Sequence, residues 1–330
     1  MIEKIKRKGS LLTVRPDIKV LDCTMRDGGL MNDFRFDDAF VKNVYQTCIK
    51  AGVDYMEIGY KGSKDIFDEN EFGAWKFCEE ADIKKIVGEN DTPLKISVMA
   101  DAGRTNYKRD ILPKDESVID MVRVATYVNQ LPTAIEMIGD AKEKGYETTV
   151  NLMAVSHVSE KELDEALEVL AKTAVDIIYI VDSFGYYYPE QIREIAMKYL
   201  NTAEKYDKQI GIHAHNNQQL AFANTIESLA LGVSYLDATI ANLGRGAGNC
   251  PLELLLGFLK NPKFSIRPIL EFIQSDILKL REQGMEWGYD IPYMITGQLN
   301  LHPRSAIQMI AEKKDQNYVK FYDELLDEKY

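Results

Sequence analysis

The sequence is poor in the residues that build a disulfide framework or a zinc knuckle. Its 330 residues include only four cysteines, none in a CxxC pair: Cys23, Cys48, Cys78 and Cys250. This spacing indicates neither a cross-linked secreted scaffold nor a cysteine-ligated structural metal. The sequence also lacks an uncharged apolar run of ~18 residues, and the apolar stretch at 10–14 is too short for a signal-peptide core. We therefore expect a soluble, cytoplasmic protein.

Positive charge is also in the minority. The chain has 40 Lys and Arg against 52 Asp and Glu, which gives a net charge of −12. Nucleic acid and anionic membranes are therefore not expected as partners. A small anionic substrate remains compatible with this balance, because one arginine or metal ion can reverse the field inside a pocket.

Short β-branched or apolar runs alternate with amphipathic segments over the first 260 residues. The predicted strands cover 20–24, 55–60, 95–100, 121–126, 148–154, 177–182, 211–215 and 235–240. The predicted helices include 37–51, 133–145, 160–173, 190–206 and 218–231, whereas 101–118 has no clean helical period. Eight βα units in sequence favour an α/β fold of the TIM (β/α)8 barrel type, with an open doubly wound sheet as the alternative.

The pattern changes after residue 260 to helical segments without further strands. These segments cover 269–283, 304–312 and 318–327. We interpret 1–258 as a catalytic barrel domain and 259–330 as a helical C-terminal extension. The extension is expected to pack on the barrel or on a partner subunit of a homo-oligomer.

A histidine pair lies at the end of the seventh predicted strand. His213 and His215 are two residues apart, so their side chains point the same way. In a parallel barrel this end of the strands forms the active site. Two imidazoles and a carboxylate make a divalent-metal site with open positions, and Asp27 at the end of the first strand is the natural third ligand. The alternative is that these histidines are structural.

Arg26, next to Asp27, is a second candidate. A guanidinium beside a metal can hold a carboxylate or a developing enolate oxygen. The alternative for Arg26 is a structural ion pair with Glu57 or Asp182, which also lie at strand ends.

The glycine-rich stretch 244–249 follows the last strand and does not give a GxGxxG pattern, so a dinucleotide site is not indicated. Close approach of Gly244 and Gly246 to a ligand is the functional interpretation, with Asn249 as a further ligand. A plain turn into a helix is the alternative. Glu57, Tyr60, Asp182 and Ser183, at other strand ends, complete the predicted substrate-binding set.

Taken together, these strand-end segments resemble the DRE-TIM metallolyase superfamily of HMGL-like proteins. The resemblance rests on 21–28, 213–216 and 244–249. That superfamily contains hydroxymethylglutaryl-CoA lyase, isopropylmalate synthase and 4-hydroxy-2-oxovalerate aldolase. Segments 152–157 and 182–183 are similar to the aldolase in particular.

The resemblance implies a role for each of these residues. Asp27, His213 and His215 would bind a divalent metal, Mn or Mg with Co or Zn as alternatives, and Asn249 would be an extra ligand. The metal would bind a 2-oxo acid, and Arg26 would stabilise the enolate. The implied reaction splits a 4-hydroxy-2-oxo acid into pyruvate and an aldehyde, or runs in reverse.

One position departs from the aldolase pattern. The aldolases carry a histidine, proposed as the base, shortly after the Arg-Asp pair, where this sequence has Leu30. A side chain of Tyr60, His157 or Tyr289, or a hydroxide on the metal, would have to replace it. Tyr289 lies where the aldolases begin a helical region and pair with an acylating aldehyde dehydrogenase, so the resemblance also implies such a partner.

Two other functions remain open at this point. A carboligase or Claisen-type synthase of the same superfamily would condense an acyl donor with a 2-oxo acid, although the tail is too short for the large regulatory domain of the isopropylmalate-type synthases. A catalytically inactive metal-binding barrel is the third hypothesis, supported only by Leu30.

Overall fold

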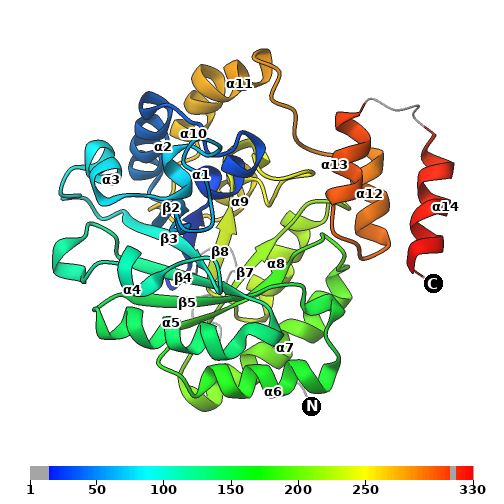
Figure 1. The fold of residues 1–330 in the computed structure, drawn as a ribbon, viewed down its shortest axis with the longest axis horizontal. Helices are drawn as coiled ribbons and strands as arrows, with labels where there is room; N and C mark the ends of the chain where they lie inside the picture. The colour runs from blue at the N-terminus through cyan, green and yellow to red at the C-terminus, as the bar shows by residue number, and fades with distance from the viewer. Residues whose placement is uncertain (1–14, 313–316, 330) are drawn as a thin grey trace.

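The structure is a computed structural model that describes residues 15–312 and 317–329, and its centre is a closed barrel of parallel strands (Figure 1). Each strand pairs with the next, and the first closes on the eighth through pairs such as Lys19 with Tyr235. The strands are β1 (Lys19–Asp22), β2 (Tyr55–Tyr60), β3 (Lys95–Asp101), β4 (Met121–Thr126), β5 (Glu147–Leu152), β6 (Ile177–Asp182), β7 (Gln209–Ala214) and β8 (Tyr235–Ala238). The predicted TIM barrel is confirmed; residues 1–14 of its predicted domain lie outside the described residues.

Helices follow the strands around the barrel (Figure 1). They are α2 (Asp38–Ala51), α3 (Glu80–Val87), α4 (Tyr107–Asp110), α5 (Leu131–Glu143), α6 (Glu160–Ala171), α7 (Pro189–Tyr206), α8 (Ala221–Leu231) and α9 (Leu252–Phe258). Helix α6 begins with a capping box between Ser159 and Glu162, and α7 begins at Pro189. The polar third unit has only the single turn of α4 and a 3-10 turn (Lys114–Glu116) after β3, as its missing helical period predicts.

The first strand is shorter than predicted. It ends at Asp22, whose carboxylate accepts hydrogen bonds from the backbone N–H and the hydroxyl of Thr24. This turn starts the short helix α1 (Thr24–Gly28), which carries Arg26 and Asp27 as buried side chains over the barrel mouth. The site residues therefore lie on a helical turn that follows β1.

The predicted C-terminal helical extension is confirmed and has two parts. In the first, α10 (Arg267–Phe272) continues through a π-turn (Ile273–Ile277) into α11 (Leu278–Glu282), and Phe272 packs on Phe40 of α2 at 5.3 Å between ring centroids. The second part comprises α12 (Ile291–Gln298), α13 (Arg304–Ala311) and α14 (Tyr318–Lys329), which share their own apolar cluster beside the barrel (Figure 1). The sequence did not predict α12, because its apolar run contains Pro292 and Gly297 and lacks a helical period. The boundary at residue 258 stays a prediction.

The interior of the barrel has an apolar layer and a charged layer. Leu21, Tyr55, Met121 and Tyr179 belong to the apolar layer. Arg123 is fully buried, with its guanidinium 4.4 Å from the Tyr179 ring centroid, and belongs to the charged layer. Among the described residues, no helix is long and apolar enough to cross a membrane.

Candidate active site

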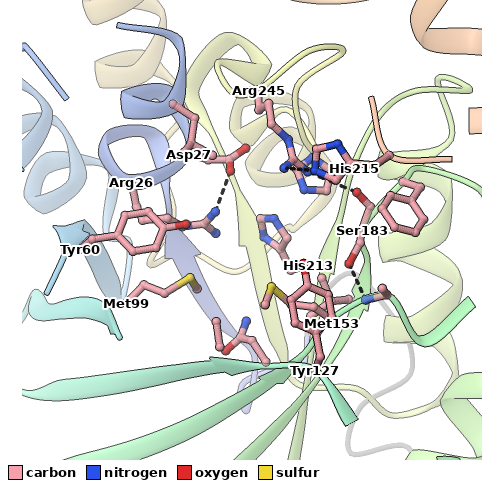
Figure 2. A pocket seen from close by; sticks show the side chains of 17 residues that line it. Arg26, Asp27, Tyr60, Met99, Tyr127, Met153, Ser183, His213, His215 and Arg245 are labelled. Atoms are coloured by element: carbon pink, nitrogen blue, oxygen red, sulfur yellow. Dashed lines mark hydrogen bonds and ion pairs between the residues drawn. The ribbon is translucent and has the colours of Figure 1, made fainter. Parts of the chain in front are cut away.

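A pocket of about 580 Å³, including its open mouth, lies at the carboxyl ends of the strands. This is where parallel barrels place their active sites. In Figure 2, Tyr60 and Arg26 lie on one wall, His213 and Met153 on the other, and Arg245 above them. The lining residues are Arg26, Asp27, Leu30, Tyr60, Met99, Ala125, Tyr127, Asn151, Met153, Ala154, Val181, Ser183, Phe184, His213, His215, Arg245 and His302.

Asp27, His213 and His215 form a buried group whose ligand atoms all lie within 4.8 Å of one another. His213 Nδ1 is 3.0 Å from a carboxylate oxygen of Asp237, which leaves Nε2 buried with no hydrogen-bond partner among the described residues. Asn249 donates from Nδ2 to Asp27, and its Oδ1 is also buried and unpartnered. Unpartnered acceptors beside a carboxylate fit a divalent cation, because buried polar atoms otherwise find partners.

The protonation states of this group also suit a cation. Burial lowers the pKa of His215 well below its ordinary value, so its imidazole is neutral at pH 7. Burial by itself would raise the pKa of Asp27, but Arg26 and the neighbouring histidines hold it well below the usual range. Metal ligands must be deprotonated, and both side chains meet that condition.

A second group, made of Cys23, His213 and Asp237, could hold a metal by distance alone. Burial raises the pKa of the Cys23 thiol well above its ordinary value, so the sulfur keeps its proton. Asp237 Oδ2 already accepts from Arg123 Nη2 at 2.6 Å. These contacts favour the group that contains Asp27 as the cation site.

A continuous set of buried ion pairs supports the site from below. Arg26 pairs with Glu57 at 2.7 Å and with Asp27 at 2.6 Å, and Arg123 lies 3.3 Å from Glu57 and 2.6 Å from Asp237. Two guanidiniums and three carboxylates leave one negative charge, which a bound cation would compensate. Arg123 and Asp237 were not predicted as site residues, although a charged residue inside an apolar strand is a sequence feature that indicates such a role.

Asp237 fixes the orientation of His213, which makes it a positioning residue. We expect Asp237→Asn to weaken metal affinity about 10- to 100-fold, because the partner of a metal-binding imidazole sets its tautomer and basicity. Isothermal titration calorimetry with Mn²⁺ would measure this effect. An unchanged dissociation constant for Mn²⁺ in a folded variant would show that Asp237 stabilises the barrel and does not contribute to metal binding.

Glu57 and Asp182, two predicted substrate-binding residues, do not line the pocket. Glu57 is fully buried and pairs with Arg26, and this ion pair is the structural alternative considered for Arg26. Asp182 accepts from the backbone N–H of Tyr186, and burial raises its pKa to about 7. Ser183 does line the pocket, and its hydroxyl accepts from the N–H of Ala154 at 2.9 Å.

The glycine-rich loop approaches the site closely at two positions. A side chain at Gly244 would overlap both the Asn249 amide and the Asp27 carboxylate, so the glycine allows these two groups to meet. Gly246 has a φ of +63° and lies against the ring of Tyr293 from α12. The loop thus joins the cation group to the C-terminal extension.

The candidate replacements for the missing base occupy different places. Tyr60 lines the pocket, whereas the exposed His157 is bound through Nε2 to the Asn300 carbonyl at 2.6 Å, outside it. Tyr289 is 48% exposed and is also not a lining residue. Leu30 is at the pocket, where it can neither give nor take a proton.

Two basic lining residues, Arg245 and His302, received no role from the sequence. Arg245 lies within the glycine-rich loop, and His302 comes from the segment between α12 and α13. His302 is the one histidine far from any predicted strand end, so strand-end reasoning did not select it. The sequence feature that could have indicated a role for Arg245 is its position between two glycines.

Known proteins are similar to this chain in sequence, and a solved structure is also similar in fold. A 4-hydroxy-2-oxovalerate aldolase of Thermus thermophilus is 31% identical over 81% of this chain and 78% of its own length. An oxaloacetate decarboxylase of Mycobacterium tuberculosis is 29% identical over 88% of this chain and 84% of its own length. A solved N-terminal domain from Bacteroides vulgatus has a TM-score of 0.76 and 26% identity, over 92% of this chain and 99% of that one. The HMGL-like profile matches residues 17–275, and the chain belongs to the HMGL-like family.

Proposed function

We propose that this chain is a divalent-metal-dependent lyase that cleaves a 4-hydroxy-2-oxo acid to pyruvate and an aldehyde, or catalyses the reverse. One observation carries the proposal: the Arg26 guanidinium and the group of Asp27, His213 and His215 line the same pocket. The names of the two relatives, an aldolase and a decarboxylase, both belong to lyases that act on 2-oxo acids.

Asp27, His213, His215 and Asn249 would hold the cation. When bound, it supplies positive charge to the carboxylate and keto oxygens of a 2-oxo acid. The mixed oxygen and nitrogen ligands suit Mn²⁺ or Mg²⁺, with Co²⁺ or Zn²⁺ as alternatives.

Arg26 supplies the second positive charge. Its Nε and Nη1 are fixed by Glu57 and Asp27, and its Nη2 is buried with no partner among the described residues. Two carboxylates hold this guanidinium in place, and it keeps one free donor. It is therefore preorganised to donate a hydrogen bond to the enolate oxygen that develops when the C–C bond breaks. Such a site requires no Schiff-base lysine.

Tyr60 is the candidate acid–base residue that lies in the pocket. Burial, reinforced by Asp101, raises its pKa, so the phenol is protonated at neutral pH and can donate to the aldehyde oxygen or relay the proton of the 4-hydroxyl group. We expect Tyr60→Phe to lower kcat for cleavage about 100-fold without changing bound metal. Tyr289→Phe is the matched control, and a larger loss in that variant would transfer the role to Tyr289.

A second candidate function follows from Leu30. Retro-aldol cleavage needs a group that removes the hydroxyl proton, whereas decarboxylation of a 3-carboxy-2-oxo acid does not. In that reaction the electrons of the breaking C–C bond pass to the enolate and CO2 departs. The lack of a base at Leu30 therefore favours a decarboxylase as the alternative to an aldolase.

Product analysis by NMR separates these activities. The EDTA-treated protein is supplied with Mn²⁺ or Mg²⁺ and given either 4-hydroxy-2-oxopentanoate or oxaloacetate. Pyruvate and acetaldehyde from the first compound would support the aldolase, and metal-dependent acceleration with the second alone would support the decarboxylase. Failure with both, together with condensation of an acyl donor and a 2-oxo acid, would support the synthase; no reaction at all would support an inactive barrel.

The predicted macromolecular partners remain predictions. Homo-oligomerisation was expected from the helical extension, and pairing with an aldehyde dehydrogenase from the resemblance to the aldolases. Size-exclusion chromatography coupled to light scattering would measure the first, and copurification with a dehydrogenase would measure the second.

A further inference from the structure

Arg245 and His302 meet at the pocket although they are far apart in the chain. Arg245 Nη1 lies 3.3 Å from His302 Nε2, and both residues line the cavity. The ring of His302 is also 6.1 Å from that of Phe184, another lining residue. The C-terminal extension thus contributes a polar side chain to a site otherwise built by the barrel.

The contact between these two side chains lacks an acceptor. His302 Nδ1 accepts from the backbone N–H of Arg304 at 3.1 Å. Burial, reinforced by Arg245 and Arg304, lowers the pKa of His302 to about 4, so its ring is neutral at pH 7. A neutral imidazole that accepts at Nδ1 carries its proton on Nε2. Two N–H donors therefore face each other, and an oxygen placed against both would satisfy them.

Arg245 also has no carboxylate in direct contact among the described residues. Among the described residues it forms no ion pair with a carboxylate; its Nη2 is 3.4 Å from the Ser183 carbonyl oxygen, and its Nε is buried without a partner. Arg26, in contrast, has two carboxylate partners. A guanidinium with open donors in a pocket matches a carboxylate, which accepts through two oxygens.

We propose that Arg245 and His302 form a receptor for a second carboxylate, so that the preferred substrate is a 2-oxo dicarboxylic acid with an acidic departing half. The inference rests on the proposed function, which places the first carboxylate and the keto oxygen at the group of Asp27, His213 and His215. The opposing donors of Arg245 and His302 then bind the far end of the molecule.

Two five-carbon 2-oxo acids that the enzyme does not cleave test this receptor. 2-Oxoglutarate carries a terminal carboxylate where 2-oxopentanoate carries a methyl group, and calorimetry with the Mn²⁺-loaded protein compares their affinities. We expect 2-oxoglutarate to bind about 10- to 100-fold more tightly, because a charge-assisted hydrogen bond is lost with the methyl compound. Arg245→Ala should remove this preference, His302→Gln should reduce it, and Arg193→Ala on α7, an exposed arginine paired with Glu227, should preserve it.

Equal affinities in the unaltered protein, or a preference that survives Arg245→Ala, would overturn the receptor. The exchange of pyruvate methyl protons with deuterated water reports separately on the proposed function. If Arg245→Ala loses the preference and the unaltered protein shows metal-dependent exchange, both proposals stand. If the unaltered protein shows no exchange, the proposed function fails whatever the binding preference is.

Discussion

Replacing Arg26 by alanine should lower kcat about 1000-fold while the protein still binds its metal. The free Nη2 of Arg26 is the donor that the proposed enolate would meet, and removing one preorganised donor of this kind costs about 100- to 1000-fold in rate. Arg26 contributes no ligand atom to the Asp27, His213 and His215 group, so metal content should change little. Steady-state kinetics and metal analysis of the same preparation would measure both quantities.

The alanine variant also removes the closest guanidinium partner of the buried Glu57 and Asp27, and breaking a buried ion pair can cost about 3–5 kcal/mol of stability. Arg26→Lys is therefore the companion variant, because it keeps the charge but loses the geometry of the guanidinium. We expect it to fold, bind metal and remain at least about 10-fold slower. Full activity in Arg26→Lys, or loss of metal in both variants, would contradict the assigned role.

His213→Ala should instead lose metal and activity together. Nε2 of His213 is the buried, unpartnered nitrogen of the proposed site, and both candidate cation groups among the described residues include His213. We expect metal affinity to fall by more than about 100-fold, beyond what the loss of a supporting residue costs. Inductively coupled plasma mass spectrometry after dialysis would measure the bound metal.

His157→Ala is the matched control for metal content, because this histidine is exposed and bound to Asn300 outside the pocket. It should retain the full metal content. A His213→Ala variant that keeps its metal would show that the cation lies elsewhere. Such a result would also exclude the group of Cys23, His213 and Asp237, because that group depends on the same imidazole.

Much of the architecture could be predicted because periodicity and topology act together. Eight alternating units imply a closed barrel, and a closed barrel brings the ends of all its strands to one mouth. That reasoning placed Asp27 from the first unit beside His213 and His215 from the seventh, which the structure brings within 4.8 Å. The strand-end residues Tyr60 and Ser183 reach the pocket for the same reason.

Strand-end position does not determine where each side chain points. His157 and Asp182 follow strands yet turn to Asn300 and to a loop amide, because short turns after the strands redirect them. Contacts that depend on how the C-terminal extension packs could also not be predicted from the sequence. Arg245 and His302 meet only because α12, which has no helical period in its sequence, packs against the glycine-rich loop.

Exchange of the pyruvate methyl protons with deuterated water, followed by NMR, tests the central claim most directly. It needs no knowledge of the aldehyde and isolates the enolate that the cation and Arg26 are proposed to stabilise. We predict exchange with Mn²⁺ or Mg²⁺ that disappears with EDTA and falls about 1000-fold in Arg26→Ala. Absence of exchange with every divalent metal, in a protein that binds those metals, would contradict the account.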